Sequence, residues 1–208
     1  MCAVIGFSGK GSRRHADLLT DLLQQSKIRG LHAFGLAYYH NGTICWMRWL
    51  ELEPAMFHLN AVASAYKQLR LIVHCRYSTS GDWKEEGNNQ PIVIGDCALA
   101  FNGVIRMSTK DEWGKEFGFK PVTDNDGEIF VRKVLDGEDW NAWVAHGAFS
   151  FAGVMLHGGR LIALRNKQRP LWHNEAYGCN FIASTADIFN RIGLGGAHEV
   201  PAGQAVFL

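Results

Sequence analysis

Residues 71–103 have the sequence LIVHCRYSTSGDWKEEGNNQPIVIGDCALAFNG, and this stretch decides how the rest of the chain is interpreted. The apolar runs 71–75 and 97–101 predict two buried strands. The polar segment between them, residues 80–90, is long for a connection, and long loops often carry function. The sequence therefore predicts polar chemistry at the point where two buried strands end.

The chain before this stretch predicts one strand, two helices and a hairpin. Residues 2–7 indicate a short buried strand, and the leucine spacing in residues 16–26 favours an amphipathic helix. The dipeptide Asn41-Gly42 lies between the apolar runs 33–39 and 43–50, which is a strong signal for a two-residue hairpin turn. A second helix is predicted over 54–69, since Pro54 suits a first helical turn.

The chain after this stretch predicts further hairpins and short helices. We expect a helix over 126–135, with Asp124 or Asn125 as its cap, and short helices near 140–145 and 185–192. The remaining strands are expected over 148–156, 161–165, 180–184 and 204–208. Strands in hairpin-like groups with helices between them are typical of an α+β fold with mostly antiparallel sheets. We expect one domain over residues 2–208.

The composition excludes several classes of protein. A formal net charge of +1 gives no argument for binding nucleic acid or an anionic membrane. No apolar run reaches the ~18–20 residues of a membrane helix, and the N-terminus lacks a signal-peptide pattern, so we expect a cytoplasmic protein.

The cysteines and histidines form no recognisable ligand set. The five cysteines are odd in number and scattered, which argues against a disulfide framework or a zinc site. We expect no metal and no cofactor. Cys45, Cys75, Cys97 and Cys179 lie in apolar surroundings and are predicted to be small buried hydrophobic residues.

Cys2 has a different potential from the other cysteines. If Met1 is removed, Cys2 carries a free α-amine, whose reference pKa is ~7.7–8.0. Such an amine can act as the general base for the thiol of the same residue. A cysteine at position 2 is weak evidence alone, because many proteins have a small residue there.

Residues 74–81, with the sequence HCRYSTSG, and the later Asn102-Gly103 strengthen this hypothesis. Together with Cys2 they resemble the glutaminase domain of the class II glutamine amidotransferases. That family has Cys directly after the initiator Met, a motif H-x-R-[WY]-[AS]-T-x-G, a loop ending near N-A-Q-P and a strand ending in N-G. Residues 28–36, 123–129, 147–151, 164–171, 183–184 and 200–203 resemble further landmarks in the same order. The chain departs from the family pattern at His32-Ala33, where the family has Asp-Ser, and at Ser80 and Asn89.

The resemblance implies a catalytic centre. It makes Cys2 the nucleophile, and the Asn102 side chain and the Gly103 backbone N–H the donors that stabilise an oxyanion. The competing interpretation of Asn102-Gly103 is a plain tight turn.

The resemblance also implies a substrate pocket. Arg76 would bind the substrate α-carboxylate and Asp126 the α-ammonium group, whereas the competing interpretations are a structural ion pair and a helix cap. Tyr77 and Thr79 would shape the pocket. Arg29 and Gly30 would lie against the nucleophile, unless they only end the first helix.

The implied fold is a four-layer αββα sandwich of two antiparallel sheets, of the N-terminal-nucleophile hydrolase type. The implied reaction is hydrolysis of L-glutamine to glutamate and ammonia through a thioester on Cys2. Because the chain ends where the family's glutaminase landmarks end, we expect a separate synthase chain to receive the ammonia. The alternatives are a hydrolase of another γ-glutamyl amide, and a catalytically silent relative with a binding or regulatory role.

Overall fold

The computed structural model describes residues 1–78 and 81–208, whose strands form two antiparallel sheets. The first sheet has the strand order β11-β9-β10-β1-β4-β2-β3. Its strands are β1 (Ala3–Gly9), β2 (Ala33–His40), β3 (Thr43–Trp49), β4 (Leu69–Arg76), β9 (Trp172–Ala176), β10 (Cys179–Ala183) and β11 (His198–Glu199). The strand that follows Cys2 therefore lies in the middle of this sheet, between β10 and β4.

The second sheet has the order β12-β8-β7-β6-β5. Its strands are β5 (Ile92–Ile94), β6 (Cys97–Val104), β7 (Ser150–His157), β8 (Arg160–Arg165) and β12 (Val206–Phe207). The inner faces of the two sheets pack on each other through small and branched side chains such as Val4, Ala100 and Val154. This interior layer brings β1 and β4 into contact with β6.

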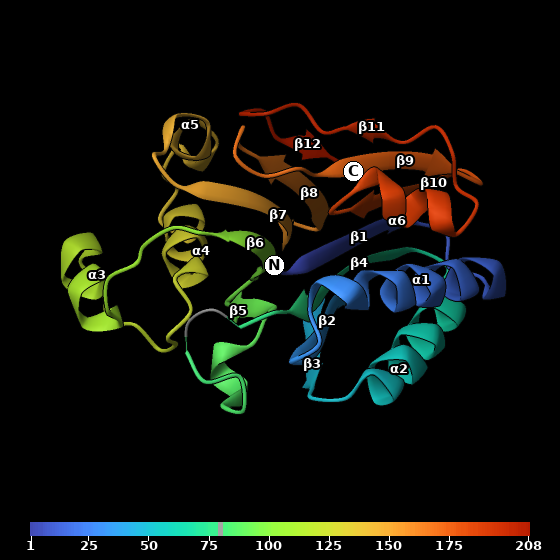
Figure 1. Cartoon of the computed structure of the whole chain (residues 1–208), viewed down its shortest axis with the longest axis horizontal. Coiled ribbons are helices and arrows are strands. Elements are labelled where there is room, and N and C mark those ends of the chain that lie inside the picture. The colour runs from blue at the N-terminus through green and yellow to red at the C-terminus, as the bar shows by residue number, and fades with distance from the viewer. Residues whose placement is uncertain (79–80) are drawn as a thin grey trace.

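Helices cover the outer faces of both sheets (Figure 1). The first sheet is covered by α1 (Arg13–Ser26), α2 (Leu52–Ala65) and α6 (Ala186–Arg191). The second sheet is covered by α4 (Gly127–Leu135) and α5 (Trp140–His146), whereas α3 (Lys110–Phe117) lies further out and joins the same core cluster through Trp113. Two single 3₁₀ turns, η1 (Lys27–Arg29) and η2 (Glu86–Asn88), complete the described elements. The predicted αββα sandwich of antiparallel sheets is confirmed.

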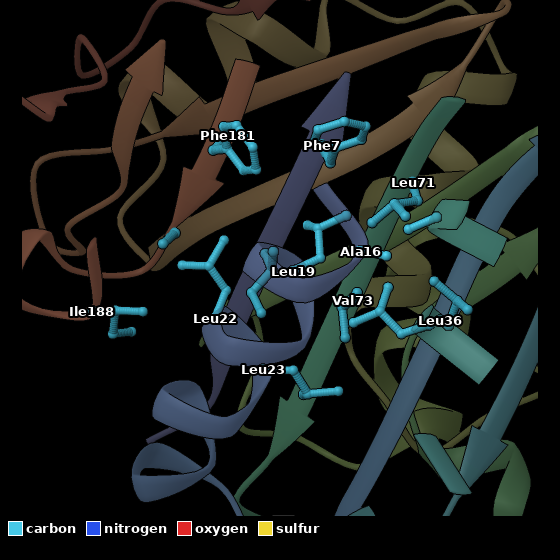
Figure 2. Packing of buried hydrophobic residues seen from close by; sticks show 14 of the residues in the cluster. Phe7, Ala16, Leu19, Leu22, Leu23, Leu36, Leu71, Val73, Phe181 and Ile188 are labelled. Carbon is cyan, nitrogen blue, oxygen red and sulfur yellow. The ribbon is translucent and has the colours of Figure 1, made fainter. Parts of the chain in front are cut away.

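The leucines of α1 explain why this helix forms and where it packs. Leu19, Leu22 and Leu23 are fully buried on one helical face, against Phe7 of β1 and Phe181 of β10 (Figure 2). Ser12 caps the helix, because its side chain accepts a hydrogen bond from the backbone N–H of His15.

Several element boundaries differ from the sequence prediction. The second helix ends at Ala65 rather than at residue 69, and β4 starts at Leu69. The cap of α4 is Asp126, not Asp124 or Asn125, although the Asn125 side chain accepts from the backbone N–H of Gly127. The turn at Asn41-Gly42 is confirmed, since both residues have positive φ angles, 49° and 79°, as the hairpin turn requires.

Candidate active site

Cys2 lies at the start of the central strand, and its thiol contacts the main chain at the end of β4. The Tyr77 backbone N–H donates to the Cys2 sulfur at 3.4 Å, and the Tyr77 carbonyl oxygen is 3.6 Å from the same sulfur. Antiparallel pairing of Ala3 with Cys75 sets this juxtaposition. Two residues that are 75 positions apart in sequence therefore meet at one end of the first sheet.

Burial raises the pKa of the Cys2 thiol above its ordinary value. The Tyr77 backbone N–H, the positive chain terminus, Arg76 and Arg29 all act in the opposite direction, because each stabilises a thiolate. Since burial dominates, the thiol needs a base to give up its proton near neutral pH.

Arg29 contacts the main chain of Cys2, and Gly30 packs against the end of β4 beside it. Arg29 Nε donates to the carbonyl oxygen of Cys2 at 3.2 Å. A Cβ atom on Gly30 would lie 2.5 Å from the carbonyl oxygen of Cys75, so only glycine lets this turn approach the end of β4. Nη2 of Arg29 and Nη1 of Arg169 lie 3.9 Å and 3.5 Å from the sulfur of Met1.

Arg76 is buried and bonds to the loop that follows it. Its Nη1 donates to the carbonyl oxygen of Asn88 at 2.6 Å and to Oδ1 of Asn89 at 2.7 Å. Its Nη2 donates to Oγ of Ser78 at 3.3 Å and to the carbonyl oxygen of Gly81 at 3.4 Å. The guanidinium group therefore holds both ends of the polar loop.

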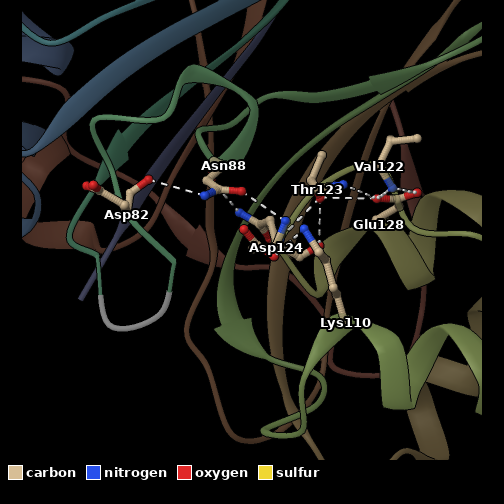
Figure 3. A network of polar contacts seen from close by, with 8 residues as sticks. Asp82, Asn88, Lys110, Val122, Thr123, Asp124 and Glu128 are labelled. Atoms are coloured by element: carbon tan, nitrogen blue, oxygen red, sulfur yellow. Dashed lines mark hydrogen bonds and ion pairs between the residues drawn. The ribbon is translucent and has the colours of Figure 1, made fainter.

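Asn88 connects this loop to the segment before α4. Its Oδ1 accepts from the Asp124 backbone N–H at 2.9 Å, and its Nδ2 donates to the Asp82 carbonyl at 3.3 Å. Figure 3 shows these contacts together with the ion pair of Lys110 and Asp124, 2.8 Å long. The segment that carries Asp126 is thus tied to the loop that is built on Arg76.

Glu128 stabilises the same segment from within the core. It is fully buried, accepts from the backbone N–H groups of Val122 and Thr123 at 3.0 and 2.9 Å, and pairs with Arg132 at 3.0 Å. Because these groups occupy its carboxylate in the core, we assign Glu128 a structural role.

Asn102 carries a polar group that the fold leaves unsatisfied. Its side chain is 4% exposed, and Nδ2 has no hydrogen-bond partner among residues 1–78 and 81–208. A buried donor without a partner costs about 1–3 kcal/mol. Asn102 lies within β6, on the strand that contacts β1 and β4.

The Gly103 backbone N–H points away from the neighbouring strand β7. Gly103 is opposite Phe151 in the register, but the N–H and C=O of Phe151 bond instead to Asn166, at 3.1 and 2.9 Å. In an antiparallel ladder both residues of such a pair point their polar groups outward. The Gly103 N–H therefore faces the side of β6 that β5 no longer covers, since β5 pairs only as far as Leu99.

A side chain at position 103 would also clash. A Cβ atom on Gly103 would lie 2.0 Å from the carbonyl oxygen of Ser150. The competing interpretation of Asn102-Gly103 as a plain tight turn is wrong, because both residues lie within β6.

Asp126 lies beside Gly103 in a pocket of about 240 Å³, which Arg106, Met107 and Trp113 also line. Its Oδ2 accepts from the backbone N–H groups of Ile105 and Arg106, at 2.5 and 2.9 Å. Burial raises the pKa of this carboxyl, and these N–H groups partly oppose the effect. The described residues show no hydrogen bond that joins Cys2 to Asn102 or to Asp126.

Sequence reasoning missed an aromatic stack at this site. The His32 ring stacks on the rings of Tyr77 and Trp83, with centroid distances of 5.0 and 5.3 Å. Tyr77 is 48% exposed, and its main chain contacts the Cys2 sulfur. Thr79, the other residue predicted to shape the pocket, lies outside the described residues.

The other cysteines are distinct from Cys2. Cys75, Cys97 and Cys179 are buried as predicted, but Cys45 is only partly buried, because β3 is the edge strand of its sheet. In the described part of the chain, no three His, Cys, Asp or Glu residues are grouped as metal ligands. Among the described helices, none has the length and apolar character needed to span a membrane.

Comparisons with known proteins identify the fold. No family model matches the chain, and no curated protein matches it either. Among solved structures, the glutamine phosphoribosylpyrophosphate amidotransferase from B. subtilis matches 99% of the chain with a TM-score of 0.78 and 19% identity. This chain has the fold of a class II glutamine amidotransferase. Another match is a glutamine aminotransferase class-II domain protein from Silicibacter pomeroyi, with a TM-score of 0.60, 14% identity and 99% of this chain covered.

The matched proteins differ in length. The chain covers 47% of the B. subtilis protein and 46% of an allosteric regulatory enzyme of purine biosynthesis, which it matches with a TM-score of 0.77, 19% identity and 99% of this chain covered. It covers 94% of the Silicibacter pomeroyi protein. The chain therefore spans about half the length of these two longer proteins.

Proposed function

We propose that this protein hydrolyses L-glutamine to glutamate and ammonia, with Cys2 as nucleophile after removal of Met1. The observation that carries this proposal is the buried, unpartnered amide nitrogen of Asn102 on the strand that contacts β1. An oxyanion that forms on the substrate would give this donor the partner it lacks. The fold supports the proposal at the level of the amidotransferase class.

In the proposed reaction the α-amine of Cys2 accepts the thiol proton, and the sulfur forms a bond to the side-chain amide carbon of glutamine. The negative oxygen is stabilised by Asn102 Nδ2 and the Gly103 N–H. The C–N bond then breaks, ammonia leaves with the proton from the amine, and a γ-glutamyl thioester remains. Water hydrolyses this thioester to glutamate and regenerates the thiol.

We place the amino-acid end of glutamine between Arg76 and Asp126. Arg76 would bind the α-carboxylate by exchanging part of its contact with the loop carbonyls for the substrate. Arg76→Lys should raise KM about tenfold or more, because a point charge cannot make the paired contacts of a guanidinium group. A KM equal to that of the wild type would show that Arg76 does not bind the substrate.

We propose that residues 2–208 form one glutaminase domain, which passes ammonia to an acceptor-binding synthase on a separate chain. The twofold length of the B. subtilis amidotransferase supports a second functional part beside this fold. Exposed apolar side chains next to the site, Ile28 and Leu31, would suit contact with such a partner. Pull-down from the native cell extract should recover a protein that raises the rate of glutamine turnover.

The test of the proposed reaction is the substrate profile of the purified protein without Met1. Release of ammonia should be faster from L-glutamine than from other γ-glutamyl amides. Faster turnover of another γ-glutamyl amide, without any partner, would support the stand-alone hydrolase instead. No turnover of any of these substrates would support a catalytically silent relative.

A further inference from the structure

The His32 ring is held by two stacked aromatic rings and by a hydrogen bond at its edge. Its ring is stacked on Tyr77 with an interplanar angle of 22° and on Trp83 with an angle of 20°. At its edge, the Ser78 backbone N–H donates to Nδ1 at 2.9 Å. Since Nδ1 accepts this bond, it carries no proton, and the ring presents its N–H at Nε2.

The main chain of His32 is also bonded to the end of β4. The His32 backbone N–H donates to the carbonyl oxygen of Arg76 at 3.0 Å. Residues 76–78 are therefore bonded on one side to His32 and, through Tyr77, on the other side to the Cys2 sulfur. His32 therefore bonds to Ser78, the neighbour of the residue whose N–H contacts the thiol.

We propose that His32 is a positioning residue, which fixes the Tyr77–Ser78 main chain so that the Tyr77 N–H stays directed at the Cys2 sulfur. This inference rests on the proposed role of Cys2 as nucleophile. The ring supplies two separable functions, an acceptor for Ser78 and a stacking surface for Tyr77 and Trp83. The aspartate that the class II amidotransferase pattern has at this position could accept a hydrogen bond from the same N–H but could not stack on aromatic rings. The combination of acceptor and stacking ring is therefore a feature of this chain.

Three variants separate the two functions. His32→Asn keeps an acceptor at the position of Nδ1 and removes the ring, whereas His32→Phe keeps a ring and removes the acceptor. His32→Ala removes both. His58→Ala is the matched control, because His58 also stacks on a tryptophan, Trp49, with a centroid distance of 5.3 Å and an interplanar angle of 22°. Its ring contacts in the described part of the chain are with Trp49 and Phe57, not with Cys2 or residues 76–78.

The first measurement is steady-state hydrolysis of glutamine. His32→Ala should lower kcat roughly 10- to 100-fold, the range expected when a reacting group is misplaced by about 1 Å. His32→Phe should lose about fivefold, as for one neutral hydrogen bond, and His32→Asn should restore most of the activity that His32→Ala loses. KM should change much less than kcat, because the substrate contacts remain.

The second measurement is the rate at which iodoacetamide alkylates Cys2 at fixed pH, followed by peptide mass. The Tyr77 N–H stabilises the thiolate, so the rate should fall in the same order as kcat. This measurement does not need turnover. If the wild type hydrolyses no glutamine but the alkylation rates follow the predicted order, the proposed function fails and the positioning role stands.

Two results would overturn the positioning role. The first is equal kcat and equal alkylation rates in the wild type and all three His32 variants. The second is an equal loss in His58→Ala, which would show that the effect is general destabilisation. Thermal unfolding of every variant checks that the compared proteins are folded.

Discussion

The core beneath α1 and the polar end of the first sheet use the same strands in opposite ways. Beneath α1, residues such as Leu19, Leu23 and Phe181 are fully buried and present no polar side-chain atoms. At this polar end, Arg76 of β4 is also buried but carries a charge, and on the facing strand β6 of the second sheet the buried Asn102 carries an unsatisfied donor. One region gains stability from every buried group, and the other retains groups that cost stability.

This difference is the reason to assign function to the polar end. A buried polar group without a partner is unfavourable, and a hydrophobic residue of similar size would often be tolerated there. We infer that the unsatisfied groups are kept for binding or chemistry. Substitutions in the core should therefore change stability, whereas substitutions at the polar end should change activity.

The largest effect is expected at Cys2. Cys2→Ala should lower glutamine hydrolysis by more than about 10⁴-fold, because the remaining groups cannot replace the covalent route. The control is Cys75→Ala, since Cys75 is fully buried and lies opposite Ala3 in the pairing of β1 with β4. It should alter stability and leave kcat near the wild-type value. Near wild-type turnover in Cys2→Ala would rule out this nucleophile.

The next largest effect is expected at Asn102. Asn102→Ala should lower kcat by roughly 10²–10³, the usual cost of one oxyanion donor. Its thermal stability should stay close to that of the wild type, because Nδ2 has no described partner to lose. An increase in KM with unchanged kcat would make Asn102 a substrate-binding residue instead.

Leu23→Ala tests the other side of the comparison. Leu23 is fully buried in the cluster beneath α1, so its truncation should reduce the free energy of unfolding by about 2–5 kcal/mol. The kcat per folded molecule should be unchanged. Denaturant unfolding and active-site titration on one preparation measure both quantities, and a large loss of kcat in fully folded protein would contradict the separation.

The smallest effect concerns acid stability. Burial, with a smaller effect from Arg76, lowers the pKa of His74 to about 3, and the nearby Phe101 carbonyl only partly opposes this. The unfolded chain binds the proton below its ordinary pKa of ~6.5, so the stability from a neutral His74 is present above that pH and is lost as pH falls towards 3. Between pH 6.5 and 4.5 the wild type should lose about 2–3 kcal/mol more than His74→Phe. Parallel pH curves for the two proteins would contradict this.

Local patterns predicted most of the first sheet and of α1. The turn at Asn41-Gly42 and the leucines of α1 are determined by local geometry and by burial on one face, so the sequence contains their signals. Helix α3 was missed because its buried face is little more than Trp113, although the capping box of Thr109 and Glu112 could have indicated its start. Strand β9 was missed because its sequence, WHNEA, lacks an apolar pattern.

In the candidate active site, too, some features follow from local sequence and others depend on how distant strands pair. Cys2, Arg76 and Asn102 were predicted because they fall within motifs that are local in sequence. The contact between Cys2 and Tyr77 depends on the pairing of β1 with β4. The stacking of His32 on Tyr77 and Trp83 joins residues more than forty positions apart, and no local pattern encodes it. The structure was needed to show how the motif residues are held.

The most direct test of the central claim is the mass of the protein after reaction with an electrophilic analogue of glutamine. We predict that protein from which Met1 has been removed gains one adduct, that peptide mapping places it on Cys2, and that L-glutamine protects against it. Cys45, the other partly buried cysteine, should stay unmodified. An adduct on Cys45, or labelling of Cys2 that glutamine does not slow, would contradict a glutamine-hydrolysing role for Cys2.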